Sequence, residues 1–192
     1  MSKEIQGILL AAGSATRFGS DKLMHPLEDG TPIAVASARH LVAALPQSLA
    51  VVRSAASALA DRLRGEGLRI VECAEASEGM GRSLAAGVQA SASALGWVVA
   101  LADMPSIRPE TIRLVAARLR AGDELAAPFL NGARGHPVGF AGSFRAQLEA
   151  SSGDAGARSL LHEHEARIAR IEVDDPGVLH DIDTPRDLAG AR

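Results

Sequence analysis

The chain has 192 residues and is 47% hydrophobic, which is enough for one domain with a sizeable core and too little for two. Its formal net charge of -3 excludes the broad basic surface that nucleic-acid backbones require, so any recognition of phosphate should be local. The single cysteine, Cys73, excludes a disulfide framework and a cysteine-based zinc site, and it fits a reducing compartment. Because the N-terminus does not resemble a signal peptide and no apolar run reaches ~18 residues, we expect a cytoplasmic protein without a membrane partner.

Short apolar runs alternate along the chain with longer segments rich in Ala, Leu and Arg, which is typical of strands and helices in an α/β protein. The expected strands span residues 5–11, 49–53, 68–72, 97–103, 124–128, 137–140 and 166–173. The expected helices span residues 32–45, 54–65, 82–95, 109–121, 143–150 and 156–164.

The apolar runs of the expected strands are nearly continuous, which indicates that both faces of the sheet are covered. The pattern therefore predicts one three-layer α/β/α domain over residues 1–192, with a mostly parallel, Rossmann-like sheet and right-handed crossovers. Ligands of such sheets gather at the carboxyl ends of the strands.

The segment ILLAAGSATRFGSDK, residues 8–22, leaves the first expected strand through glycine and small polar residues and then places Arg17 and Lys22. Such a turn exposes backbone N–H groups, and two nearby cations extend the same attraction to phosphate. The segment does not match G-x-G-x-x-G, because Gly13 and Gly19 are too far apart. It does not match the P-loop either, because Gly19 is followed directly by Ser and Asp and not by Lys. Taken alone, it is equally compatible with a solvated turn.

Two carboxylates stand at positions suited to a metal ion. Asp103 follows the apolar run of WVVALADMP and should lie at the carboxyl end of a strand, where a hard oxygen ligand suits Mg²⁺. Its alternative role is that of a helix cap or a turn residue before the helix expected at 109–121. Asp183 lies in LHDIDTPRDLA before a short helix expected near Pro185, and ordinary capping is again the alternative. The two can share one cation only if the fold brings them together.

Motifs over nearly the whole chain, LLAAGSATRFGSDK, EGMGRSLAAGV, VVALADMP, GARGHPVGF, GDAGARSLL and DIDTPRDL, together resemble the MobA-like nucleotidyltransferases. The resemblance is greatest to the branch of molybdenum cofactor cytidylyltransferases. It implies a nucleotide-diphospho-sugar transferase type of fold and Mg²⁺ as the cofactor.

The resemblance also implies roles for individual residues. Arg17 and Lys22 would contact the triphosphate and act in catalysis together with Asp103, and Asp103 and Asp183 would hold Mg²⁺. For the acceptor it points to His136, Asp154 and Arg158, although a structural histidine and a helix cap at 153–158 are the alternatives. The remaining nucleotide-binding positions that it implies are Leu10, Ala11, Ala12, Gly13, Gly79 and Ser83.

By the same resemblance, the reaction is attack by the phosphate of molybdopterin on the α-phosphorus of CTP, which forms molybdopterin cytosine dinucleotide and releases pyrophosphate. CTP and molybdopterin are the expected partners, and a molybdoenzyme or its maturation factor would receive the product. The LAAG opening with Ala12 favours CTP, whereas LAGG tends to accompany guanylyl transfer. The alternatives are GTP-dependent transfer to the same cofactor, transfer to a sugar phosphate, and a non-catalytic nucleotide- or cofactor-binding module.

Overall fold

The computed structural model describes residues 4–13, 21–153 and 156–190, with side chains to residue 188. The strands are β1 (Ile5–Leu10), β2 (Ser48–Val52), β3 (Arg69–Glu72), β4 (Gly96–Leu101), β5 (Leu125–Leu130), β6 (Ala133–Arg134), β7 (Val138–Ala141) and β8 (Ile168–Glu172). The α-helices are α1 (Ile33–Ala44), α2 (Ala58–Gly65), α3 (Met80–Ala90), α4 (Pro109–Arg120), α5 (Arg145–Glu149) and α6 (Arg158–Glu163). The 3-10 helices are η1 (Lys22–Met24), η2 (Ala74–Glu78), η3 (Gly142–Phe144), η4 (Glu165–Arg167), η5 (Pro176–Leu179) and η6 (Pro185–Gly190).

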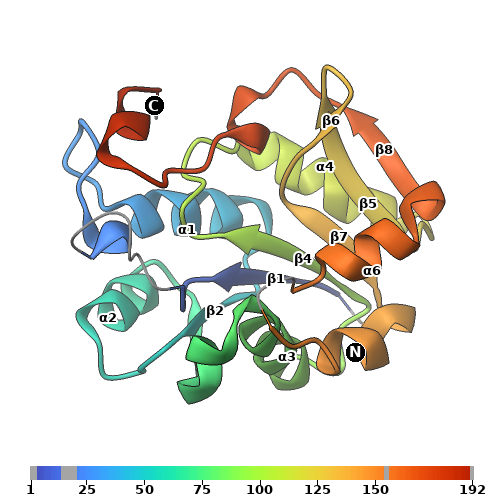
Figure 1. The fold of residues 1–192 in the computed structure, drawn as a ribbon, viewed down its shortest axis with the longest axis horizontal. Helices are drawn as coiled ribbons and strands as arrows, with labels where there is room; N and C mark the ends of the chain where they lie inside the picture. The colour runs from blue at the N-terminus through green and yellow to red at the C-terminus, as the bar shows by residue number, and fades with distance from the viewer. Residues whose placement is uncertain (1–3, 14–20, 154–155, 191–192) are drawn as a thin grey trace.

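The described strands form one mixed sheet in the order β3-β2-β1-β4-β7-β5-β6, and β8 pairs with β5. β1 to β4 are parallel to one another, whereas β7 runs antiparallel to both of its neighbours, β4 and β5. β7 and β8 both pair with Leu125 and Ala126, so they lie along opposite edges of β5. The mostly parallel α/β sheet predicted from the apolar runs is confirmed (Figure 1).

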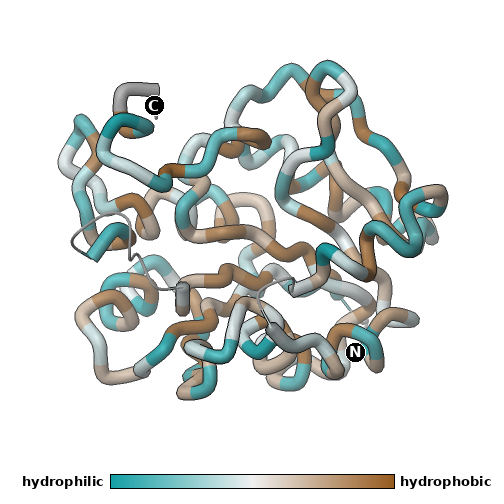
Figure 2. Tube along the Cα trace, in the orientation of Figure 1, coloured by the Kyte–Doolittle hydropathy of each residue, from teal (hydrophilic) through white to brown (hydrophobic). Residues whose placement is uncertain are grey.

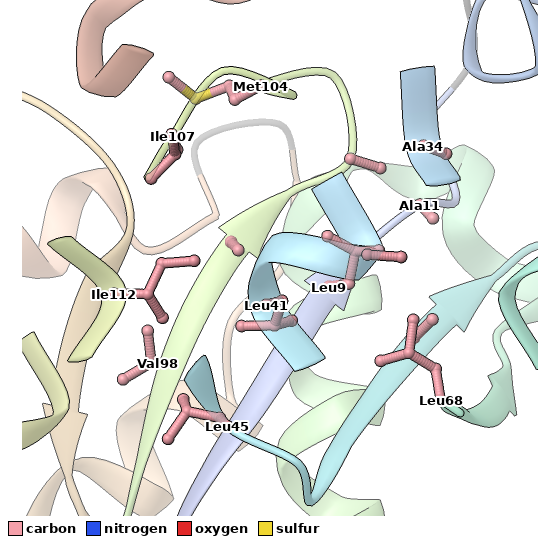
Figure 3. Packing of buried hydrophobic residues seen from close by; sticks show 14 of the residues in the cluster. Leu9, Ala11, Ala34, Leu41, Leu45, Leu68, Val98, Met104, Ile107 and Ile112 are labelled. Atoms are coloured by element: carbon pink, nitrogen blue, oxygen red, sulfur yellow. The ribbon is translucent and has the colours of Figure 1, made fainter. Parts of the chain in front are cut away.

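Helices cover both faces of the sheet because successive strand side chains point to opposite faces. On β1, Leu9 packs in a cluster with Leu41 of α1 and Ile112 of α4 (Figure 3), whereas its neighbour Ile8 packs in a second cluster with Leu84 of α3. Figure 2 shows the consequence as hydrophobic colour along the central strands and hydrophilic colour over much of the periphery. None of the described helices is long and apolar enough to cross a membrane.

The helix boundaries differ from the expected ones where polar groups fix the ends. α2 begins at Ala58 because the Ser57 side chain accepts a hydrogen bond from the Ala60 N–H at 3.2 Å. α3 begins at Met80 and ends at Ala90, so it starts earlier and stops earlier than the expected span 82–95. Its end coincides with Ser91, whose hydroxyl donates to the Gly87 carbonyl and accepts from the Trp97 indole.

Buried Asp175, 2% exposed, ties the segment that carries η5 to the start of α4. Its carboxylate accepts hydrogen bonds from the Arg108 N–H at 2.9 Å, the Thr111 hydroxyl at 2.6 Å and the Gly177 N–H at 3.1 Å. Gly177 has no room for a side chain here, since an added Cβ would lie 2.2 Å from the Ser106 carbonyl oxygen. Asp175 and Gly177 thereby fix the loop between β4 and α4, in which Asp103 lies.

Asp175→Ala should lower the free energy of unfolding by about 2–3 kcal/mol, because it leaves a buried N–H and a buried hydroxyl without their acceptor. Urea titration monitored by circular dichroism measures the change. The matched control is Asp174→Ala at the exposed neighbouring position, which should change stability by less than about 0.5 kcal/mol. Equal stability of the two variants would contradict this account of Asp175.

Candidate functional site

Lys22, Asp103 and Asp183 meet at the carboxyl end of the central strands. The Lys22 Nζ donates to Asp103 Oδ2 at 2.9 Å and to Asp183 Oδ1 at 3.1 Å. The lysine is almost enclosed, with 11% of its side chain exposed, compared with 25% for Asp103 and 49% for Asp183. One cation therefore bridges two carboxylates from distant parts of the chain.

Asp103 is held by the extension of the sheet beyond β4. The Ala102 N–H donates to the Leu10 carbonyl, and the Ala102 carbonyl accepts from the buried Ser37 hydroxyl of α1 at 2.9 Å. Met104 is buried directly after it. Asp103 does not cap α4, because Arg108 occupies the N-cap position, but it does lie in a turn.

Asp183 reaches the site because its segment is fixed at three points. The Ile182 N–H donates to the Asp103 carbonyl at 2.9 Å, and the fully buried Ile182 side chain packs against Ile33 of α1. Beyond the site, Asp187 accepts hydrogen bonds from the Asp183 and Thr184 N–H groups and from the Thr184 hydroxyl. Capping chemistry is thus present at η6, but Asp187 provides it and leaves the Asp183 carboxylate to the site.

The charge of Lys22 is stabilised by its two partners. Burial lowers the pKa of Lys22, but the hydrogen bonds and negative charges of Asp103 and Asp183 together outweigh it, so the pKa is raised. The lysine is therefore an ammonium ion throughout the physiological range, and it supplies the positive charge that two converging carboxylates require.

The same two carboxylates have the chemistry of a divalent metal site. They already share the Lys22 ammonium, and oxygen ligands of this type suit Mg²⁺ or Mn²⁺. Within the described residues, no group of three or more His, Cys, Asp or Glu side chains could hold a metal ion. A pair of carboxylates fits Mg²⁺, which is usually bound through one or two protein carboxylates, water and substrate phosphates.

The turn after β1 lies beside this centre. Leu10 pairs with Leu101 across the β1–β4 ladder, and Leu10, Ala11 and Ala12 are buried, so a ligand can meet their backbone more readily than their side chains. Gly13 is exposed. Arg17 lies outside the described residues, as does Asp154.

The second expected nucleotide-binding segment starts α3. Gly79 is the N-cap of this helix, with φ 117°, a conformation that favours glycine. Ser83 is buried one turn into the helix, and burial is the chief cause that raises the pKa of the buried Cys73 thiol. Because Gly79 is the N-cap, Ser83 does not cap α3, and its contact with a nucleotide stays a prediction.

His136 and Arg158 line one cavity of about 270 Å³ on the face of the sheet that α3 covers. Leu84 of α3, Val99 of β4 and Phe140 of β7 form part of its apolar wall. Arg134 also lines the cavity. It belongs to the motif GARGHPVGF but was not among the site residues expected from the sequence. The two-residue strand β6 that holds Arg134 was too short to be expected.

His136 is kept neutral inside this cavity. Burial lowers its pKa, and the charges of Arg134 and Arg158 act in the same direction, against the opposing effect of Asp103 and Asp181. Its Nδ1 atom is buried and has no hydrogen-bond partner among the residues that the structure describes. Leu10 and Leu101, at the carboxyl ends of β1 and β4, also line the cavity, so it reaches the edge of the sheet beyond which Asp103 lies.

Comparison with known proteins identifies relatives over nearly the full chain. A family model described as a MobA-like NTP transferase domain matches residues 7–168, so Asp183 lies beyond the match. Nicotine blue oxidoreductase from Paenarthrobacter nicotinovorans is 30% identical over 94% of this chain and 92% of its own length. Purine catabolism protein PucB from Bacillus subtilis is 29% identical with the same coverage.

Solved structures show the same fold. Rv0371c from Mycobacterium tuberculosis H37Rv superposes with a TM-score of 0.84 at 26% identity, covering 99% of this chain and 98% of that one. The same mycobacterial protein has been solved in complex with manganese, with a TM-score of 0.77 at 24% identity and coverage of 98% and 97%.

The neutral His136 should make stability depend on pH. Its folded-state pKa lies below the ordinary 6.5, so the unfolded chain binds more protons and stability falls as the pH drops below that value. We expect His136→Gln to lose less thermal stability than the native protein between about pH 7.5 and about pH 5.5. Melting curves at each pH measure this, with exposed His162→Gln as the control that should follow the native protein.

Proposed function

Because the chain belongs to the MobA-like NTP transferase family, we propose that it is a metal-dependent nucleotidyltransferase that transfers CMP from CTP to molybdopterin. The products are molybdopterin cytosine dinucleotide and pyrophosphate. We propose a single nucleotidyltransferase domain over residues 1–192 that works in the cytoplasm and passes its product to a molybdoenzyme or a maturation factor.

The observation that carries the proposal is the convergence of Lys22, Asp103 and Asp183 beside the turn after β1. A nucleotide-binding module needs a phosphate turn, but it has no need of two carboxylates held around one cation next to that turn. The arrangement supports catalysis at a phosphorus atom, where placing cations against developing negative charge is the main task of the protein.

In the proposed mechanism, Asp103 and Asp183 hold a divalent metal, which supplies Lewis-acid stabilisation of phosphate oxygens when bound. Manganese in the related mycobacterial protein is consistent with this role. Lys22 neutralises the leaving pyrophosphate as a compact charge, and Arg17 contributes a forked contact. The turn Leu10–Gly13 offers backbone N–H groups to the nucleotide. No general base is required, because the attacking phosphate is already ionised.

The choice of CTP rests on Ala12 in the LAAG opening, and guanylyl transfer to the same acceptor is the alternative. A sugar phosphate acceptor is less well supported, because the cavity beside the site is lined mainly by apolar side chains. A redox activity, as the name of one relative indicates for that protein, finds no dinucleotide fingerprint after β1 in this chain.

Asp103→Asn and Asp183→Asn should each reduce pyrophosphate release by about 100-fold or more, because each removes a negative charge from the metal site. The assay supplies Mg²⁺ and molybdopterin with CTP or GTP in parallel. Exposed Asp181→Asn, two residues from Asp183, is the matched control and should retain most of the activity.

Turnover with CTP and not with GTP supports cytosine as the base and molybdopterin as the acceptor. Turnover with GTP alone would move the assignment to guanylyl transfer, and release with neither nucleotide would contradict transfer to molybdopterin. Full activity of Asp103→Asn with native circular dichroism would contradict the proposed metal site.

Lys22→Met should bind Mn²⁺ several-fold more tightly than the native protein in the absence of nucleotide. The ammonium and the metal compete for the same two carboxylates, so removing the ammonium removes the competitor. Electron paramagnetic resonance of free Mn²⁺ measures the affinity without turnover. Lys22→Arg keeps the competing charge and should not tighten binding; if it tightens binding as much as Lys22→Met, competition is not the cause.

A further inference from the structure

A second cavity, of about 580 Å³, lies beside α1 and the start of α4, and we call it the α1–α4 cavity. His40 of α1, Ser106 of the loop before α4, and Leu179 and His180 of the η5 segment belong to its wall. α1 and α4 cover one face of the sheet and α3 covers the other (Figure 1). None of the described residues lines both this cavity and the one that holds His136, so the two are separate.

Two polar atoms in the wall of the α1–α4 cavity have no partner. Within the described residues, three side-chain polar atoms are buried without a hydrogen bond, and two of them, His40 Nδ1 and Ser106 Oγ, belong to residues that line this cavity. An unpaired buried polar group lowers stability, because it has lost water without gaining another partner. Two such groups at one cavity indicate a ligand that supplies the missing hydrogen bonds.

The charges in the wall favour an uncharged ligand. Apart from the two histidines, the lining residues carry one charge of each sign, Arg108 and Asp175. Asp175 accepts hydrogen bonds from the Arg108 N–H and the Thr111 hydroxyl, so it already occupies the place where the start of α4 attracts an anion. The Arg108 guanidinium donates to the Asp174 carbonyl at 2.7 Å. Neither an anion nor a cation therefore meets an unengaged opposite charge.

The remaining wall decides the kind of uncharged ligand. Imidazole and hydroxyl groups can each donate or accept, so a ligand with an N–H beside a carbonyl matches both. Pro109, Pro176 and Leu179, which is 42% exposed, supply apolar surface for a ring. We propose that the α1–α4 cavity binds a small neutral cyclic amide, whose N–H and carbonyl pair with His40 and Ser106 and whose ring packs on the apolar wall. A change of rotamer at the two side chains presents their shielded atoms to the ligand.

The place of the cavity gives such a ligand an influence on the metal site. Ser106 belongs to the loop that carries Asp103, and His180 belongs to the segment that carries Asp183. The Ile182 N–H joins the two segments by its hydrogen bond to the Asp103 carbonyl. A ligand that contacts both segments holds the two carboxylates together and acts as an effector. This effector role, unlike the binding itself, rests on the proposed function.

2-Pyridone is the probe, because it is an uncharged planar ring with an N–H next to its carbonyl. Nuclear magnetic resonance titration of the full chain, without nucleotide or metal, measures its affinity. Ser106→Ala and His40→Phe should each weaken binding about fivefold, since each removes one hydrogen bond. The matched controls Ser143→Ala and His162→Phe, at exposed positions, should leave the affinity unchanged.

The melting temperature separates a ligand contact from a structural role. Ser106→Ala should melt at the same or a higher temperature than the native protein, because the hydroxyl has no partner to lose. If it melts lower, the hydroxyl is satisfied within the protein or by an ordered water, and the proposal is wrong. The proposal is also overturned if 2-pyridone does not bind, or if N-methyl-2-pyridone, which lacks the N–H, binds as tightly.

The effector role is tested by the affinity for Mn²⁺, measured by electron paramagnetic resonance with and without saturating 2-pyridone. We expect Mn²⁺ to bind several-fold more tightly with the ligand, and 2-pyridone to bind more tightly with Mn²⁺ by the same factor. Unchanged affinities would overturn the effector role. Because 2-pyridone binding is measured without metal, CTP or molybdopterin, failure of this site and failure of the transfer assay are distinguishable.

Discussion

The hydrogen bond from the Ile182 N–H to the Asp103 carbonyl is the link on which the site depends. It fixes the segment that carries Asp183 to the loop after β4, and the buried contact between Ile182 and Ile33 holds the same segment against α1. Lys22 is 81 residues from Asp103 and 161 residues from Asp183 in sequence, so nothing local could bring their charges together. The parallel strands bring these residues together, because the carboxyl ends of such strands all lie at one edge of the sheet.

The architecture was largely predictable because it follows from the periodicity of apolar residues. Strands such as β1 and β4 are buried on both faces and therefore read as continuous apolar runs. Boundaries were less predictable where single polar contacts decide them, as with Ser57 before α2 and Ser91 after α3. The strand β6 escaped notice because two residues carry no period.

The site, too, was predictable from the sequence only in part. Asp103 could be anticipated from its place after a strand, whereas its proximity to Asp183 required the fold. Arg134 gave no signal of its own in the sequence, since a single arginine in a short hairpin resembles any solvated residue. Its place on the wall of the cavity that holds His136 is revealed only by the three-dimensional arrangement.

The position of Asp183 near the end of the described chain has a consequence for synthesis on the ribosome. The strands that build the carboxyl edge, and Lys22 and Asp103 with them, are complete well before Asp183 is added, and domains generally fold from the N-terminal side as they emerge. A nascent chain would thus hold Lys22 beside Asp103 before the second carboxylate of the proposed metal site is present. The proposed metal site would be complete only after the segment that carries Asp183 has left the exit tunnel and docked against α1.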